Sequence, residues 1–149
     1  MKQLYYDVKK CLGCKSCEIA CAIAHSVTQD LFKSIKEQRL SLPRKKVYFS
    51  AGKNYPVSCR HCEDPKCVVA CMSGCLTYDK EKKMVIHDES RCVGCWMCVM
   101  SCPYGAIRPN IKTKIPVRCD KCKDKEEPVC VQACPTGAII WQEEMVIKK

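Results

Sequence analysis

The sequence lacks the long apolar segments that would place it in a membrane or on a secretory route. No run approaches the ~20 apolar residues that a membrane-spanning helix needs, so we expect no membrane anchor and a cytoplasmic location. Residues 1–7 contain no apolar stretch typical of a signal peptide, and no twin-arginine segment occurs. These absences argue against a secreted disulfide-rich protein. Phe and Trp occur only twice each, so aromatic packing contributes little to the core.

A recognisable catalytic constellation is also missing. The three histidines, His25, His61 and His87, have no carboxylate or serine at a suggestive spacing. General acid–base or nucleophilic catalysis needs such a partner within hydrogen-bonding reach. We therefore predict a chain without a catalytic site of its own.

Cysteine, in contrast, is abundant: the 149 residues contain seventeen. Sixteen form four motifs: Cys11-x2-Cys14-x2-Cys17-x3-Cys21, Cys59-x2-Cys62-x4-Cys67-x3-Cys71, Cys92-x2-Cys95-x2-Cys98-x3-Cys102-Pro103 and Cys119-x2-Cys122-x7-Cys130-x3-Cys134-Pro135. The third motif has the bacterial ferredoxin spacing, in which three thiolates bind one [4Fe–4S] cluster and the fourth binds its neighbour. Zinc sites use separated pairs of ligands, and an odd number of cysteines does not suit a disulfide framework. The pattern therefore favours iron–sulfur clusters.

The remaining cysteine is Cys75. Residues 71–76, 102–107 and 134–139 align with one another, and Cys75 occupies the position of Ala106 and Ala138. We predict that Cys75 is a small buried side chain and not a ligand. The alternative is a spare or exchangeable ligand.

The formal net charge of +10 does not indicate a nucleic-acid-binding protein. An oxidised [4Fe–4S] core with four thiolates carries about −2, so four clusters would leave roughly +2. The lysines are dispersed and form no basic stripe, so we expect them to be counterions and predict no nucleic-acid partner. Lys15, Arg60 and Arg118 are expected to be solvated surface charges; the alternative is that they raise the potentials of nearby clusters.

The segments that connect the motifs predict short strands and helices. We expect a helix after Cys17 that runs longer than its counterparts because Ala22 replaces a proline. A connector at 26–56 includes an amphipathic helical turn near 31–40 and a strand at 47–49, and either packs on the cluster units or forms a docking surface. Further predictions are strands at 4–8, 138–141 and 145–147, a β-hairpin at 76–87 and a hairpin-like passage at 107–117.

The order and spacing of the four motifs resemble the four-cluster ferredoxin-like electron-transfer subunits of molybdenum or tungsten oxidoreductases, formate dehydrogenases, hydrogenases and carbon monoxide dehydrogenase. Residues 17–26 and 59–65 are most similar to the small subunits of carbon monoxide dehydrogenase and of tungsten aldehyde oxidoreductase, and we do not rank these two. The resemblance implies an α+β fold of two pseudo-symmetric ferredoxin-like units, with short hairpins, short helices and a small hydrophobic core. It also implies anaerobic electron transport with four [4Fe–4S] clusters. The implied partners are a tungsten, molybdenum or nickel–iron catalytic subunit, a flavin-containing NAD(P)H-oxidoreductase subunit and further copies of the chain.

The pairing of the motifs is open from local sequence alone, because 107–117 could join motifs three and four. The resemblance implies that motifs two and three form one unit and motifs one and four the other, which requires the two terminal strands to pair. The units are then 1–25 with 113–149, the connector 26–56, and an inserted unit at 57–112. The implied ligand sets are Cys11, Cys14, Cys17 and Cys134 (cluster 1); Cys21, Cys119, Cys122 and Cys130 (cluster 2); Cys59, Cys62, Cys67 and Cys102 (cluster 3); and Cys71, Cys92, Cys95 and Cys98 (cluster 4).

Two other functions fit the same motifs. One is a free polyferredoxin that diffuses between enzymes, although the near-neutral charge with clusters bound fits an acidic carrier poorly. The other is an assembly protein for a metalloenzyme. Neither the catalytic partner nor the direction of electron flow follows from the sequence.

Overall fold

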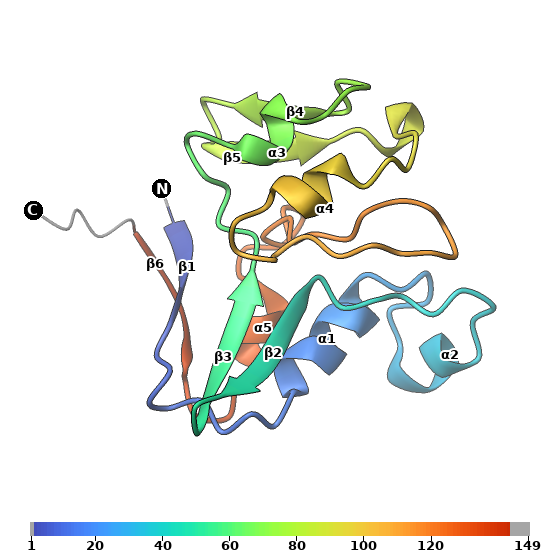
Figure 1. The fold of residues 1–149 in the computed structure, drawn as a ribbon. Helices are drawn as coiled ribbons and strands as arrows, with labels where there is room; N and C mark the ends of the chain where they lie inside the picture. The colour runs from blue at the N-terminus through green and yellow to red at the C-terminus, as the bar shows by residue number, and fades with distance from the viewer. Residues whose placement is uncertain (1, 144–149) are drawn as a thin grey trace, which may run out of the picture.

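The computed structural model describes residues 2–143, which form an α+β fold of short helices and two-stranded sheets (Figure 1). The strands are β1 Lys2–Tyr6, β2 Lys45–Ser50, β3 Lys53–Ser58, β4 Leu76–Asp79, β5 Met84–His87 and β6 Ile139–Glu143. The helices are α1 Ser16–Ala24, α2 Leu31–Ile35, α3 Lys66–Val69, α4 Met97–Ser101 and α5 Val129–Gln132, with a 3₁₀ turn at Glu89–Arg91. The predicted fold class is confirmed.

The first and last described strands pair with each other. β1 and β6 are antiparallel, with Leu4 opposite Trp141 and Tyr6 opposite Ile139. This sheet lies at one side of the molecule, where the start of β1 and the end of β6 are next to each other (Figure 1). The pairing matches the expected strands at 4–8 and 138–141; the strand expected at 145–147 lies outside the described residues.

Two hairpins complete the described sheets. The predicted hairpin at 76–87 is confirmed as β4–β5, with Thr77 opposite Ile86. The connector contains a second hairpin, β2–β3, of which the sequence indicated only the first strand. The hairpin-like passage expected at 107–117 is present as an isolated antiparallel bridge between Arg108 and Val117, without extended strands. Pro109 and Pro116 lie just inside that bridge and cannot donate the ladder hydrogen bonds.

The helices pack in pairs around the cysteine motifs. α1 has nine residues, whereas α3, α4 and α5 have four or five, as the missing proline predicted. α1 packs against α5, and α3 packs against α4. Figure 1 shows α3, α4 and the β4–β5 hairpin above the layer that holds α1, α5 and the other two sheets. None of the helices among residues 2–143 is long and apolar enough to cross a membrane.

The connector helix α2 has no buried face. Asp30 caps its first turn by accepting hydrogen bonds from the amides of Phe32 and Lys33. The predicted helical turn is therefore present, but Phe32, Ile35 and Leu40 are all exposed. By contrast, Val47 of β2 is buried against Cys17 and Ile139. The hairpin part of the connector therefore packs on the cysteine motifs, whereas α2 does not.

Candidate iron–sulfur centres

The four cysteine motifs repeat one backbone conformation. The residue immediately before the second cysteine has a positive φ in every motif: Gly13 (71°), His61 (51°), Gly94 (69°) and Lys121 (59°). Glycine adopts this conformation freely, whereas a side chain there costs energy that tertiary contacts must offset. For His61, one such contact is the hydrogen bond that its Nδ1 accepts from the Val85 amide at 3.1 Å. The repeated turn shows that the motifs are structural equivalents despite their unequal spacing.

In the first and third motifs, glycine is required for space as well as for φ. A Cβ on Gly94 would lie 2.6 Å from the Lys114 carbonyl oxygen, and one on Gly13 would lie 2.5 Å from Asn54 Oδ1. The Asn54 side chain can move, although it currently donates to the Cys11 carbonyl. The Lys114 carbonyl is backbone, so position 94 tolerates no side chain without a backbone shift.

We expect Gly94→Ala to destabilise the protein more than Gly105→Ala. Both positions have positive φ, which costs alanine about 1–2 kcal/mol. Only position 94 adds a clash, and such overpacking typically costs a further amount of about 1–3 kcal/mol, similar to the cost of the positive φ. Anaerobic thermal unfolding of both variants measures the difference. Equal melting temperatures would show that the Lys114 segment yields without cost.

The cysteines of motifs one and four lie together. Cys11, Cys14, Cys17 and Cys134 line one small cavity. Cys21, Cys119, Cys122 and Cys130 are all buried, and the charges of Cys21 and Cys130 contribute to raising the pKa of both Cys119 and Cys122. Each group combines cysteines from the two ends of the sequence.

The cysteines of motifs two and three gather in the same way. Cys59, Cys62, Cys67 and Cys102 line a cavity of about 330 Å³. Cys71, Cys92 and Cys95 each raise the pKa of the buried Cys98 thiol by their charge. The four groups coincide with the four predicted ligand sets. The assignment of these thiols as ligands stays a prediction.

Exposure differs between the groups. Of the sixteen motif cysteines, Cys14 and Cys95 are the two exposed ones, and each is the second cysteine of its motif. The group around Cys119 is the most buried. Burial raises the pKa of Cys119 to about 12 and that of Cys122 to about 11. Such thiols stay protonated unless a metal displaces the proton, which coordinating metal ions do.

Two buried cations indicate that these groups hold something anionic. Lys45 is 2% exposed and Arg118 is 6% exposed. Lys45 Nζ and Arg118 Nε have no nitrogen or oxygen hydrogen-bond partner among the described residues. Buried cations without a counterion are costly, and clusters of about −2 charge would compensate them. The residues present therefore fit [4Fe–4S] clusters.

The expectation that Arg118 is a solvated surface charge is wrong. Its Nη2 donates to the Val85 carbonyl at 2.6 Å, and its Nη1 lies 3.9 Å from Cys59 Sγ. Lys15 and Arg60 are exposed as expected, with Arg60 stacked on the Tyr104 ring at 4.2 Å. The sequence does not distinguish these three cations because burial depends on contacts between distant segments.

His25 is not isolated, contrary to prediction. The Nε2 of His25 lies 3.2 Å from Asp120 Oδ1, and the other carboxylate oxygen of Asp120 accepts a hydrogen bond from Arg44. The Nδ1 of His25 bonds to the Cys21 carbonyl at 2.7 Å. Burial lowers the pKa of His25, but the hydrogen bonds to Asp120 and Cys21 outweigh this effect and raise it to about 9. Asp120 also accepts from the Cys122 amide. This three-residue cluster joins α1, the connector and the fourth motif.

His61, in contrast, is buried and neutral. Burial and the nearby charge of Arg118 lower the pKa of His61 to about 3. Its Nε2 is buried without a hydrogen-bond partner among the described residues, and His61 lies between Cys59 and Cys62 in the sequence. A hydrogen bond from this nitrogen toward a cluster therefore stays open as the alternative to simple packing.

Cys75 lies beside the fourth cysteine group. It is 4% exposed, its Sγ lies 3.3 Å from Cys71 Sγ, and it is near His87 and Cys92. It packs with Leu76 and Val85 in the core beside the β4–β5 hairpin. The position suits a buried packing residue, and its closeness to Cys71 keeps the spare-ligand alternative open.

We expect Cys75→Ala to retain all of its iron. Because the other sixteen cysteines supply every ligand in our assignment, the variant should still bind about sixteen iron atoms per chain. Iron analysis and absorbance after anaerobic reconstitution measure this, with Cys71→Ala as the matched control that should lose iron. A loss of about four iron atoms from Cys75→Ala would make Cys75 a ligand.

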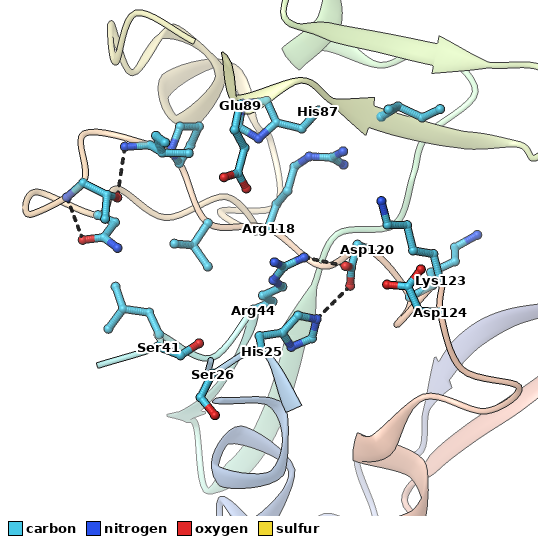
Figure 2. Close-up of a pocket in the computed structure, with 18 of the residues that line it drawn as sticks. His25, Ser26, Ser41, Arg44, His87, Glu89, Arg118, Asp120, Lys123 and Asp124 are labelled. Carbon is cyan, nitrogen blue, oxygen red and sulfur yellow. Dashed lines mark hydrogen bonds and ion pairs between the residues drawn. The ribbon is translucent and has the colours of Figure 1, made fainter. Parts of the chain in front are cut away.

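A cavity of about 870 Å³ has no cysteine in its lining (Figure 2). Its lining combines the end of α1, the connector, the β5 end and residues 110–125. Figure 2 shows His25, Arg44 and Asp120 linked on one wall, with His87, Glu89 and Arg118 opposite. Because no cysteine lines it, this cavity is not one of the four candidate cluster sites.

Comparisons with known proteins agree with this geometry. An iron–sulfur protein of Rhodospirillum rubrum is 39% identical, covering 91% of this chain and 79% of that protein. The electron transport protein HydN of Escherichia coli is 37% identical, over 90% and 83% of the two proteins. One subunit of the anaerobic dimethyl sulfoxide reductase of E. coli is 32% identical, over 91% and 70%.

Solved structures show the same fold. The active site complex BamBC of benzoyl coenzyme A reductase with 1,5-dienoyl-CoA matches with a TM-score of 0.55 and 20% identity, covering 100% of this chain and 79% of the matched one. The family model described as 4Fe-4S dicluster domain matches residues 50–144. This chain therefore belongs to the 4Fe-4S dicluster domain family.

Proposed function

We propose that this chain is the electron-transfer subunit of a redox enzyme complex and carries four [4Fe–4S] clusters. The observation that carries the proposal is the gathering of sixteen motif cysteines into four groups of four. When bound, a [4Fe–4S] cluster takes up and releases one electron at a time. The name of HydN, an electron transport protein, supports the same role.

The chain holds neighbouring groups together through its short helices. α1 contains Cys17 of the first set and Cys21 of the second, so one helix is shared by two proposed clusters. In the same way, α4 contains Cys98 of the fourth set, and Cys102 of the third set follows directly at its C-terminal end. Each helix therefore sets the separation of two adjacent clusters.

The exposure of the cysteines supports an order for the four sites. Sets 1 and 4 contain the exposed Cys14 and Cys95, whereas set 2 is fully buried and set 3 has no exposed member. Arg118 lies between sets 2 and 3, since it precedes Cys119 and contacts Cys59. We propose the order 1–2–3–4, with electrons entering and leaving next to Cys14 and Cys95.

The proposed partner is the catalytic subunit of an oxidoreductase. This proposal is supported by a sequence relative that is a subunit of dimethyl sulfoxide reductase and by a similar structure from the active site complex of benzoyl-CoA reductase. We propose an aldehyde oxidoreductase or carbon monoxide dehydrogenase type of partner, with a flavin subunit or a ferredoxin at the other end. The chain itself contributes ligands, spacing and charge rather than catalysis.

Anaerobic co-purification tests the proposal. A tagged chain purified from its own organism should bring down one catalytic subunit in fixed stoichiometry and contain about sixteen iron atoms. Isolation as a monomer that exchanges electrons with several enzymes would instead support a free carrier. Transfer of clusters to an apo-enzyme with loss of its own would support an assembly protein.

A further inference from the structure

A buried lysine lies between the first and second cysteine sets. Lys45 begins β2, and its Nζ lies 4.8 Å from the centre of the Tyr6 ring. Lys45 lies on the same buried face of β2 as Val47, and Val47 packs against Cys17 and Cys130. The charge of Lys45 also favours the thiolate form of both cysteines, against the larger effect of burial on their pKa. Lys45 therefore acts electrostatically on one ligand of proposed cluster 1 and one of cluster 2.

A buried arginine has the corresponding place between the second and third sets. Arg118 precedes Cys119 and places Nη1 3.9 Å from Cys59 Sγ. Its charge also lowers the pKa of Cys67, against the larger effect of burial. Two ligands of proposed cluster 3 thus face this guanidinium.

Neither cation is neutralised by a carboxylate among residues 2–143. The nearby carboxylates are already engaged. Glu18 accepts from the Val47 amide at 2.7 Å and lies 3.8 Å from Lys46 Nζ, while Asp120 pairs with Arg44. No direct ion pair among the described residues therefore cancels the charges of Lys45 and Arg118, which act on the cysteine sets that they face.

The fourth set has no equivalent in the part of the chain that the structure describes. Its Cys98 packs in a core with Leu76, Val85 and Ile107, which it shares with Cys67 of set 3. Arg91, the cation next to Cys92, is exposed and donates to the Ser73 carbonyl. Solvent screens such a charge, so its effect is small.

We propose that Lys45 and Arg118 raise the reduction potentials of the clusters they face, Lys45 those of clusters 1 and 2 and Arg118 that of cluster 3, leaving cluster 4 without such a contribution. Reduction adds one electron to a cluster, and a fixed positive charge nearby favours the more negative state. The proposal rests on the proposed function, because it assumes the four ligand sets. It predicts an uneven series of potentials along the chain.

The test is an anaerobic redox titration of the reconstituted protein with dithionite, followed by electron paramagnetic resonance. In Lys45→Met and Arg118→Met, the ratio of reduced to oxidised cluster at a fixed potential should fall about tenfold for the facing clusters, which is about 59 mV for a one-electron couple. Lys45→Arg and Arg118→Lys keep the positive charge, so their ratio of reduced to oxidised cluster should stay close to that of the wild type. Lys82→Met removes an exposed lysine and should change nothing. The signal of cluster 4, identified by its loss in Cys95→Ala, should not shift.

Unchanged potentials in both Met variants with full iron content would overturn the proposal but leave the four-cluster function intact. Equal shifts in the Met variants and in their charge-retaining counterparts would also overturn it, since packing would then be the cause. If a Met variant loses a cluster, the Gln variant is titrated instead. Loss of the same cluster in both would show that the cation is needed for assembly and does not tune the potential. Wild-type protein that binds no clusters would refute the proposed function itself.

Discussion

Cys95→Ala should remove or convert one cluster and block electron transfer at one end of the chain. Cys95 is one of the two exposed motif cysteines, and its removal leaves set 4 with three ligands. Iron should fall from about sixteen to about twelve atoms per chain if the cluster is lost, or to about fifteen if a [3Fe–4S] centre forms. Iron analysis, electron paramagnetic resonance and reduction rates with each partner measure the result.

Cys14→Ala is the matched variant at the opposite end. It should cause the same loss of iron but slow transfer with the other partner. Cys75→Ala provides the control for a buried cysteine outside the ligand sets. Iron remaining at about sixteen atoms in Cys95→Ala would contradict the ligand assignment. Equal slowing with both partners in the two variants would contradict the proposed order of clusters.

Asp120→Asn should destabilise the protein by about 1–3 kcal/mol, which is less than the cost of breaking a fully buried ion pair because the site is partly solvated. The carboxylate accepts hydrogen bonds from Arg44 and His25, and also from the Cys122 amide. Asparagine keeps an oxygen for the amide but leaves the two cations without an anion. Anaerobic thermal unfolding, monitored by cluster absorbance, measures the loss.

Asp124→Asn is the control, because it changes an exposed carboxylate on the same loop and should be neutral. In the double variant Arg44→Met with Asp120→Asn, the cost should be less than the sum of the single costs, since the two residues share one interaction. Additive costs would show that the Arg44–Asp120 pair contributes nothing. If Asp120→Asn unfolded at the wild-type temperature while Asp124→Asn unfolded at a lower one, Asp120 would not be the stabilising carboxylate.

The sequence predicted the local features well because each depends on a short segment. The cysteine spacings predicted four related loops, and the loops do share one backbone turn at Gly13, His61, Gly94 and Lys121. The greater length of α1 was predicted from Ala22 in place of a proline, although α3, whose motif has Met72 at the same position, has only four residues. The β4–β5 hairpin followed from the charged turn between alternating residues.

Features that depend on distant segments were not predicted. His25 and Asp120 are 95 positions apart, and nothing near either residue indicates the other. The burial of Arg118 depends on β5 and on Cys59, neither of which adjoins it in sequence. The amphipathic pattern of 31–40 predicted a helix, but the pattern does not say whether a surface within the chain covers its apolar side.

The pairing of β1 with β6 and of α1 with α5 has a consequence for the order of events during synthesis. Cys11, Cys14, Cys17 and Cys21 leave the ribosome first, yet the helix and strand that complete their unit follow about a hundred residues later. The second and third motifs, with the β4–β5 hairpin between them, have all been synthesised long before that. Contiguous pieces of a chain fold as they become available, so this central segment can fold first. The earliest cysteines of the chain are then the last to be enclosed.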